Sequence, residues 1–412
     1  MRKLFPLTSM SGLFLLILLL TSLGAPVSSA VAADSRVIAW GAGSVINTAD
    51  GNDYGQSLVP GSLTNAVFVS GGWLHSLALS SNGTLRGWGD DSVSQTDFFP
   101  PGTNNYQAIA CGYLHSLALR TNGTVASAGY SFYNQTAFPS GLSNVVAVSC
   151  GAYNSIALKS DGSLAAWGAG SDTNKFGTTP DYNQSIIPPG LSNVVAVAAG
   201  AYHTLALTQS GSLAAWGYDV DGRGEIPPGI SNVVAISAGW SHNLVLRADG
   251  SVACWGANNF GQTNVPPNAT NIVAIAAGGF HNLALKADGT VIAWGAGGGS
   301  NTNFDYHQNL VPAGLTNVVQ IAAGLLHSLA LTNNAGILLH TPQVNPVFQT
   351  NGFGLQIASR NGRVYRLEYK NSLSDTVWNT TLPLRAGNGG LLQLLDPTAS
   401  ASGQRLYRVE QW

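Results

Sequence analysis

A repeated alternation of apolar and mixed segments runs through most of the chain. It is clearest in residues 194–217, VVAVAAGAYHTLALTQSGSLAAWG, and in residues 272–295, IVAIAAGGFHNLALKADGTVIAWG. A run of small apolar side chains is followed by an alternating HxLAL segment and then by an Ala-Trp-Gly segment. Each of these patterns is typical of a β-strand, and the Asn-Gly or Asp-Gly pairs before the third segment favour two-residue hairpins. Each unit therefore predicts at least three antiparallel strands.

The unit occurs seven times. Its histidine position is occupied in turn by His75, His115, Asn154, His203, His242, His281 and His327. A period of about 40 residues indicates a repeat architecture, and blades of four strands fit a propeller. A fourth, outer strand is predicted around a recurring glutamine, at Gln56, Gln95, Gln135, Gln184, Gln262 and Gln308, with Arg223 at the remaining place. The sequence thus predicts an all-β, seven-bladed β-propeller over residues 34–340.

The two ends of the repeat region complement each other. The Trp-Gly position is occupied by Trp40, Trp88, Ala128, Trp167, Trp216, Trp255 and Trp294. This series begins before the first histidine position and ends before the last one. We therefore expect residues 36–41 to pair into the blade begun by residues 318–331, so that strand exchange closes the ring and leaves few exposed edges.

The segments outside the repeats differ in character. Residues 1–33 combine Arg2 and Lys3, an apolar run over residues 12–20 and small residues at 30–33, which is typical of a secretory signal peptide. The run is too short for a membrane span, so a secreted protein is expected in the periplasm, on the cell surface or in the medium. Residues 341–352 are interpreted as a linker, and residues 353–412 as a small β-sandwich-like module. Sorting, surface attachment and glycan contact all remain open as its role.

Charge and cysteine content narrow the functions. Charged residues make up 9% of the chain and the formal net charge is −2, so no basic field for nucleic acid and no polybasic membrane patch is expected. Three cysteines cannot form a disulfide framework. Cys111 and Cys150 occupy the same position in consecutive repeats. They are interpreted either as small buried residues or as a bridge between blades, and the sequence leaves both open.

The GxxHxLAL segment, the Asn/Asp-Gly turn and the AWG segment together resemble the regulator of chromosome condensation repeat family over residues 36 to about 335. The departures are Asn154 for His, Ala128 for Trp, Arg223 for Gln and Ala335 at a turn glycine. The resemblance implies a propeller fold. Guanine nucleotide exchange, which the family name evokes, is not favoured for an exported chain.

The histidines are interpreted as structural, each hydrogen-bonding turn backbone, because equivalent positions around a ring do not converge on one metal ion. These are His75, His115, His203, His242, His281 and His327. The chain has no GxSxG, HExxH or CxxC motif and no phosphate-binding glycine loop. We therefore expect no enzyme activity, cofactor or metal, with a glycosidase based on paired carboxylates as the alternative.

Large side chains recur inside the GxxH turns, on one face of the ring. This feature resembles the secreted bacterial β-lactamase inhibitor that uses the same propeller. The resemblance implies a protein-binding face made by Trp73, Tyr113, Tyr153, Tyr202, Trp240 and Phe280. The alternative is that these rings only fold back over neighbouring blades.

Three longer loops share an Asp-Tyr-x-Gln pattern and are expected on a different face. Their tyrosines, Tyr54, Tyr182 and Tyr306, are secondary candidates for a protein or carbohydrate contact, although shared ancestry also explains the pattern. The leading hypothesis is an extracellular scaffold that binds a protein partner. The alternative is a structural or glycan-binding component of the cell surface, held there by the C-terminal module.

Overall fold

The computed structural model describes most of the repeat region and the strands that follow it. The described residues are 35–44, 46–47, 51–96, 104–171, 181–297 and 304–333, and beyond them 344–349, 352–358, 364–370, 379–380, 384–387, 391–396 and 406–411. The predicted signal peptide lies outside this part of the chain. Within it, no helix is long and apolar enough to cross a membrane.

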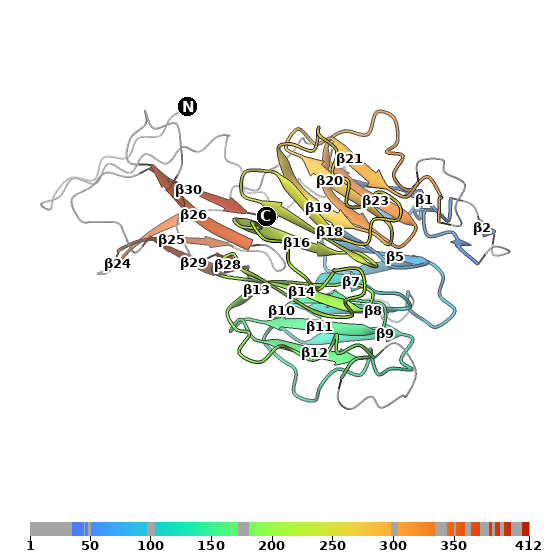
Figure 1. Ribbon diagram of the computed structural model, residues 1–412, viewed down its shortest axis with the longest axis horizontal. Helices are drawn as coiled ribbons and strands as arrows, with labels where there is room; N and C mark the ends of the chain where they lie inside the picture. Colours follow the sequence, from blue (N-terminus) through green and yellow to red (C-terminus); the bar gives the residue numbers. More distant parts are fainter. Residues whose placement is uncertain are drawn as a thin grey trace, which may run out of the picture.

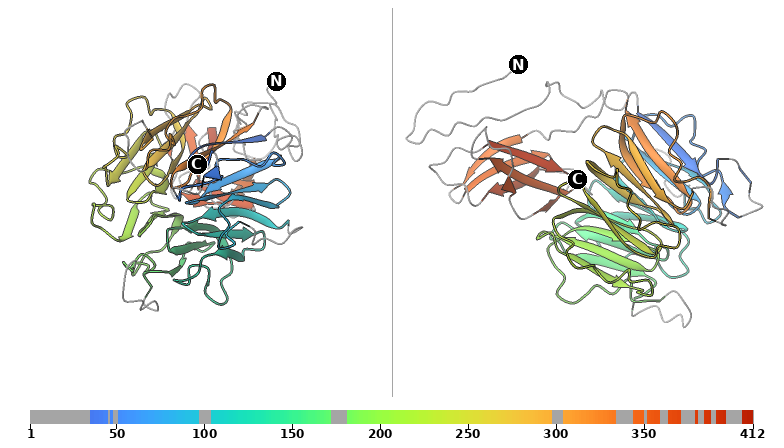
Figure 2. Two further views of the ribbon diagram at one scale, coloured as in Figure 1. Left: turned by 90° about the vertical axis from the view of Figure 1, so that its right-hand side faces the viewer. Right: turned by 45° about the horizontal axis from the view of Figure 1, so that its top comes forward.

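Seven antiparallel sheets of three strands are arranged around one axis (Figures 1 and 2). In chain order the blades are β4(Ala66–Gly71), β5(His75–Ser80), β6(Leu85–Gly89); β7(Tyr106–Cys111), β8(His115–Arg120), β9(Val125–Gly129); β10(Val145–Cys150), β11(Asn154–Lys159), β12(Leu164–Gly168); β13(Val194–Ala199), β14(His203–Thr208), β15(Leu213–Gly217); β16(Val233–Ala238), β17(His242–Arg247), β18(Val252–Gly256); β19(Ile272–Ala277), β20(His281–Lys286), β21(Val291–Gly295); and β22(Val318–Ala323), β23(His327–Asn333), β1(Ser35–Gly41). The first strand of each blade contacts the first strand of the next, and β22 contacts β4, so the series returns to its start.

The seventh blade takes its third strand from the other end of the repeat region. β1 pairs antiparallel with β23 along its whole length, from Ser35 opposite Asn333 to Gly41 opposite His327. Trp40 is buried there, and its Nε1 donates a hydrogen bond to the carbonyl of Gln308 at 2.9 Å. The strand exchange expected for residues 36–41 is therefore present.

The hairpin turns follow from their sequence. The Oδ1 of Asn82 accepts hydrogen bonds from the backbone N of Thr84 at 3.1 Å and from its hydroxyl at 2.7 Å, while Gly83 has a φ of 81°. Glycine is favoured at such a φ because it lacks a Cβ. Asn122, Asp161 and Asp288 make the same pair of bonds at the equivalent turns.

Among the described residues, none of these sheets contains the fourth strand predicted around the recurring glutamine. The chain turns there instead, because the residue before the glutamine position has a positive φ in every blade, at Gly55, Ser94, Asn134, Asn183, Gly222, Gly261 and His307. Each glutamine also uses its own side chain locally: the Oε1 of Gln135, for example, accepts from the backbone N of Tyr133 at 2.9 Å. This prediction was wrong, and the segments are described below as the Gln loops.

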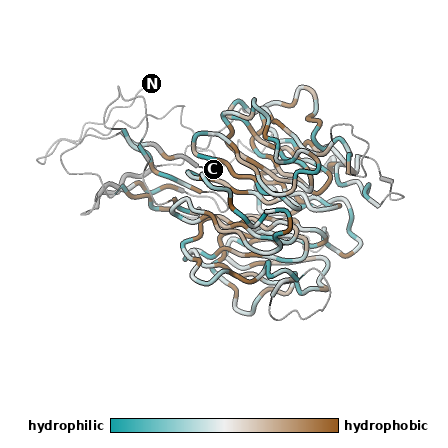
Figure 3. The backbone as a smooth tube through the Cα atoms, in the orientation of Figure 1, coloured by the Kyte–Doolittle hydropathy of each residue, from teal (hydrophilic) through white to brown (hydrophobic). Residues whose placement is uncertain are grey.

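The core is divided among the contacts between blades. The middle strands are buried almost throughout, and their leucines, such as Leu205 and Leu244, have no exposed surface. Along the chain, hydrophobic residues concentrate in the strands and polar residues in the connections (Figure 3). The blades are therefore held together by apolar clusters that join neighbouring sheets.

The C-terminal residues form two further sheets. One contains β24(Val344–Gln349), β25(Gly352–Ala358) and β29(Leu391–Asp396), and the other contains β26(Val364–Lys370), β27(Asn379–Thr380), β28(Arg385–Ala386) and β30(Leu406–Gln411). The two sheets share an apolar core that includes Leu355 and Tyr365, which fits the predicted β-sandwich-like module. The linker predicted over residues 341–352 is corrected in part, because residues 344–349 pair with β25 as a strand of this module.

The module packs against one end of the propeller. Val364 and Leu384 are buried in an apolar cluster with Val195 and Val233, and the backbone N of Leu384 donates to the carbonyl of Gln209 at 3.0 Å. Gln209 lies in a hairpin turn between the second and third strands of its blade. Figure 1 shows the module on the left and the loop around β2(Ile46–Asn47) on the right, so they occupy opposite ends of the ring.

Candidate functional site

The GxxH turns and the Gln loops lie at the same end of the propeller, opposite the C-terminal module. The middle strand of each blade begins at this end and the third strand finishes there, because the three strands are antiparallel. We call this end the rim. The long loops of Tyr54, Tyr182 and Tyr306 were predicted on a different face, and that prediction was wrong: Tyr182, for example, contacts Tyr202 of a GxxH turn.

The six aromatic residues predicted from the GxxH turns form one continuous cluster. The rings of Trp73 and Tyr113 stack with centroids 3.9 Å apart, and Tyr113 also contacts Tyr153 at 5.5 Å. Trp240 contacts three of the other rings. Its centroid lies 5.6 Å from that of Tyr113, 5.8 Å from that of Tyr202 and 6.5 Å from that of Phe280. Each ring is half-buried, so each one packs on its neighbours and also presents surface to solvent.

A second tier of aromatic residues comes from the Gln loops. Two residues before the glutamine stand Tyr133, Tyr182 and Phe260, and each packs against a GxxH ring, on Tyr153 at 5.2 Å, Tyr202 at 5.6 Å and Phe280 at 5.1 Å respectively. The sequence analysis missed Tyr133 and Phe260. The signal was present, because this position is also aromatic at Tyr54 and Tyr306.

Further rings extend the surface outward. Phe304 lies 4.6 Å from Phe280, Tyr218 lies 4.1 Å from Tyr182, and Phe132 lies 5.0 Å from Tyr133. Phe132 and Phe304 are exposed, at 58% and 39%. Of the other long-loop tyrosines, Tyr306 accepts a hydrogen bond through its hydroxyl from the Nδ2 of Asn52 at 2.8 Å, and Tyr54 donates its backbone N to the Oε1 of Gln56.

The rings of this cluster are uncharged. Burial is the main reason that the pKa of Tyr153 is raised to about 12, and it likewise raises the pKa of Tyr113 and Tyr202. The three phenols therefore stay protonated at any physiological pH. The cluster can offer apolar area, ring faces and hydroxyl groups to a partner.

The inner edge of the cluster surrounds the mouth of the central channel. Trp73, Tyr113, Trp240 and Leu325 line a depression of about 90 Å³ there, above a layer of glycines and small residues. Cys111 and Cys150 also line it and are free thiols rather than a disulfide. Burial raises the pKa of Cys111 to about 12 and also raises that of Cys150, so neither thiol is a ready nucleophile.

The six histidines join neighbouring blades. The Nε2 of His75 lies 2.9 Å from the hydroxyl of Ser116 in the next blade, and the same position contacts Ser155, Asn243, Asn282, Ser328 and Ser76 around the ring. The hydroxyl of Ser116 in turn donates to the carbonyl of Gln95 at 3.0 Å. The histidine must then be the donor to Ser116, which identifies its neutral Nε2-protonated form.

The structural role expected for the histidines fits these contacts, but the expected partner does not. The contacted group is a side chain of the adjacent blade, whereas the prediction named turn backbone. Burial holds the histidine pKa values at about 3 to 4. Among the residues that the structure describes, no three His, Cys, Asp or Glu side chains gather as a metal site would require.

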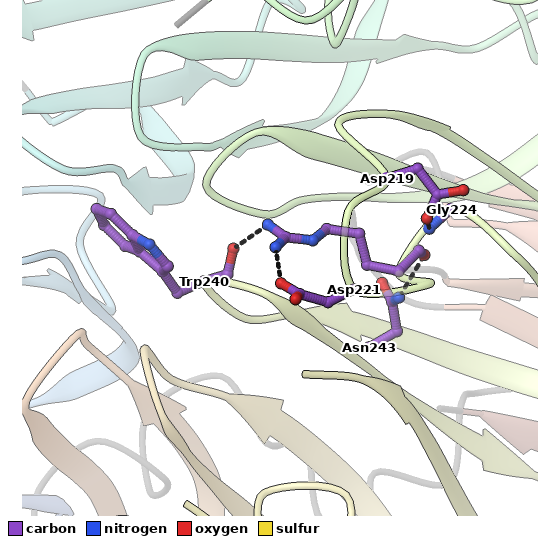
Figure 4. A network of polar contacts seen from close by, with 6 residues as sticks. Asp219, Asp221, Gly224, Trp240 and Asn243 are labelled. Carbon is purple, nitrogen blue, oxygen red and sulfur yellow. Dashed lines mark hydrogen bonds and ion pairs between the residues drawn. The ribbon is translucent and has the colours of Figure 1, made fainter. Parts of the chain in front are cut away.

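Arg223 is the exception among the Gln loops. Its buried guanidinium makes an ion pair with Asp221, lies 3.5 Å from the carbonyl of Trp240 through Nη1, and sits over the ring of Tyr218 at 5.1 Å. Its own carbonyl accepts from the Nδ2 of Asn243, as glutamine carbonyls do elsewhere (Figure 4). This network places one cation, whose charge is neutralised by Asp221, next to the aromatic cluster.

Comparison with known proteins agrees with this architecture. The Regulator of chromosome condensation (RCC1) repeat matches residues 66–95, 106–135, 145–174, 194–223, 233–262 and 272–303. Among curated proteins, none matches this chain significantly.

Solved structures share the fold at low identity. Prp20p from Saccharomyces cerevisiae is 19% identical, covering 72% of this chain and 91% of its own, with a TM-score of 0.56. Human WBSCR16 is 20% identical, covering 72% and 98%, with a TM-score of 0.54. Yeast RCC1 in its complex with Kap60 is 18% identical, covering 80% and 96%, with a TM-score of 0.57. From its repeats and its blades, the chain belongs to the RCC1-repeat family of β-propellers.

Proposed function

We propose that this protein is an exported scaffold that binds a protein partner on the aromatic cluster of its rim. The observation that carries the proposal is the continuity of this cluster, in which six half-buried rings from GxxH turns are joined by rings of the Gln loops. Partly exposed aromatic surface of this extent is typical of interaction sites, and Tyr and Trp dominate binding hot spots.

The packing of the rings favours tight binding. Stacked rings such as Trp73 and Tyr113 are already held in place before a partner arrives. A partner that docks on them therefore loses little side-chain entropy at the interface. The described residues of the C-terminal module pack at the other end of the ring, at Gln209 and Val195, and do not cover the rim.

Related propellers support an interaction role for the fold. The structure of yeast Prp20p was presented with its binding properties to Gsp1p and histones, and the same protein, yeast RCC1 (Prp20), was also solved bound to Kap60. Export of the present chain rests on the composition of residues 1–33. N-terminal sequencing of the protein recovered outside the cytoplasm should therefore find a first residue near position 34.

Capture from the extracellular and envelope proteins of the producing organism tests the binding face. The bait is the chain without residues 1–33, and the variant carries Trp73→Ala, Tyr113→Ala, Trp240→Ala and Phe280→Ala. Phe138→Ala is the control, because Phe138 is 41% exposed and belongs to none of the ring contacts described above. Thermal unfolding of each bait checks that it is folded.

A protein retained by the wild type and by the control, and lost from the rim variant, is the expected result. Equal retention by all three baits contradicts the proposal. Retention on a polysaccharide that disappears when residues 342–412 are removed would instead identify a glycan-binding surface protein.

A further inference from the structure

The charged side chains of the propeller are divided unequally between its two ends. The GxxH turns themselves carry no charged residue. In the described parts of the Gln loops, the carboxylates are Asp53, Asp90, Asp91, Asp181, Asp219, Asp221, Glu225 and Asp305, and the cation is Arg223. The rim therefore combines an uncharged aromatic centre with an acidic border.

The opposite end has the reverse balance. Its cations stand at or near the hairpin turns, at Arg86, Arg120, Lys159, Arg247 and Lys286, beside the turn carboxylates Asp161, Asp249 and Asp288. A formal net charge of only −2 for the whole chain hides this separation. Because the ends of the blades face opposite directions, a partner that approaches the rim meets negative potential.

Arg223, the one cation in the described parts of the Gln loops, is not available to an acidic partner. Arg223 is 3% exposed and is already neutralised by Asp221, and its guanidinium rests on the ring of Tyr218. An acidic group on a partner would therefore face the carboxylates of the border rather than an open arginine.

Acidic and aromatic residues occur together in one sector of the rim. It consists of the Gln loop between β12 and β13 and the Gln loop between β15 and β16. The side chains of Asp181 and Asp219 are exposed, and each is adjacent in sequence to a ring of the cluster, Tyr182 or Tyr218. These two rings lie 4.1 Å apart and continue through Tyr202 to Trp240. In such a sector an arginine or lysine is attracted both by the charge of the carboxylates and by the ring quadrupoles. The Tyr218 ring already carries one guanidinium, that of Arg223.

We infer that the segment of the partner protein that docks on this sector is basic, with arginine or lysine side chains placed among apolar ones. The inference rests on the proposed function and adds the chemistry of the partner. Acidic surface around an apolar centre would speed the approach of a basic segment and would discriminate against acidic ones. A neutral glycan carries no charge for the acidic border to attract, and its hydroxyls could only donate hydrogen bonds to individual carboxylates.

The test uses three 12-residue peptides that share the same tryptophan and leucine positions and differ only in four places, occupied by arginine, glutamine or glutamate. Binding to the chain without residues 1–33 is measured by fluorescence anisotropy at low and at high salt. Asp181→Asn with Asp219→Asn is the test variant, since asparagine keeps the Oδ1 that accepts from Gly224 in the Asp219 turn. Asp161→Asn with Asp249→Asn is the matched control, because these are also exposed turn aspartates but lie at the opposite end.

The arginine peptide should bind most tightly, and the test variant should weaken it about three- to tenfold while the control leaves it unchanged, with the difference reduced at high salt. Equal binding of the three peptides, or equal loss in both variants, overturns the inference, as does failure of the arginine peptide to bind. If all three peptides bind equally and Trp240→Ala removes them all, the aromatic face still binds protein segments and only its basic preference is refuted.

Discussion

One histidine at each of six blade contacts links two neighbouring sheets. Its Nε2 donates to a serine or asparagine of the next blade, which in turn donates to the carbonyl of a Gln loop. At the seventh contact, Asn154 replaces the histidine, and its Oδ1 and Nδ2 have no hydrogen-bond partner among the described residues. Six of the seven blade contacts therefore contain the histidine hydrogen bond, and the seventh has an asparagine that does not make it.

Because only the histidines make this hydrogen bond, alanine substitutions at a histidine and at Asn154 should lower the free energy of unfolding by different amounts. His281→Ala leaves the hydroxyl of Ser328, 2.9 Å away, without its donor and opens a space at a fully buried position. It should lower the free energy of unfolding by about 1 to 3 kcal/mol. Asn154→Ala removes an amide without such a bond and should cost clearly less. Urea unfolding of both variants measures the difference, and equal losses would show that the histidine contributes only volume.

The histidines also predict how stability depends on pH. Burial holds their pKa values at about 4 for His75 and His242 and at about 3 for the other four, against 6.5 when unfolded. Below pH 6.5 the unfolded chain binds protons that the folded chain does not. Their contribution is therefore fully present above pH 6.5 and is lost as pH falls, toward about 4 for His75 and His242 and toward about 3 for the other four.

Each histidine lowers the free energy of unfolding by at most about 1.4 kcal/mol per pH unit in that range. Urea unfolding at pH 7.5, 6, 5 and 4.5 should show a steep decline, and His281→Asn should make it shallower by about one proton. The exposed aspartates Asp161 and Asp288 have lowered pKa values, so their stabilising contribution is constant above about pH 4 and is lost only below it. A flat profile between pH 7 and 5 would falsify the account of neutral histidines.

At the level of elements, the blades could be predicted from the sequence because their signals are local. The Asn-Gly turn, the alternating HxLAL segment and the recurring Trp each report on strands that are adjacent in the chain. The Gln loops were wrongly predicted to be strands. The chain turns there at a residue with a positive φ, such as Ser94 or His307, and these residue types do not indicate a positive φ from sequence alone. The histidine partner was missed because it lies about 40 residues away, in another blade.

The aromatic cluster was half predicted for a similar reason. Rings in the GxxH turns stand beside an obvious motif, whereas Tyr133 and Phe260 are recognisable only once the glutamine is taken as the reference position. Their contacts with Tyr153 and Phe280 join residues that are 20 positions apart and belong to different elements. A register fixed on the glutamine would have found them.

The closing strand is the element whose removal should affect the ring most. Deleting residues 34–41 strips β23 of the partner with which it pairs over seven residues, and removes the buried Trp40. We expect the melting temperature to fall by about ten degrees or more, because the deletion removes a buried strand and several kcal/mol of stability with it. A synthetic peptide of residues 34–41 should restore part of the loss, whereas a peptide with the same residues in scrambled order should not. Unchanged melting of the deletion variant would contradict closure by this strand.

At the scale of the whole molecule, the two ends of the propeller differ in their residues and in their contacts. The rim carries the aromatic cluster and its acidic border, and the other end carries hairpin turns, most of the cations and the contact with the C-terminal module. Leu384 is 1% exposed in that contact, and it lies near the start of β13, at the end of the blade opposite Tyr202. The module therefore covers apolar surface of the propeller without reaching the rim in the part of the chain that is described.

This separation predicts that stability and binding respond differently to truncation. Removing residues 342–412 takes Val364 and Leu384 out of the apolar cluster that they share with Val195 and Val233 in the full chain. The truncated propeller should bind an apolar dye and melt at a lower temperature, since surface of this kind is stabilising only when it is covered. Leu384→Ala in the full chain should reproduce part of both effects, because it leaves the module in place but weakens the contact.

Binding at the rim should stay the same in both variants, because no group of the aromatic cluster described here touches the module. The measurement is the affinity of the arginine peptide, or of the captured partner, for the full chain, the truncated chain and the Leu384→Ala variant at a temperature where all three are folded. Equal affinities support two independent ends. A loss of binding that follows truncation but not Leu384→Ala would mean that the module itself contributes to the partner site, and the rim would then be only part of the interface.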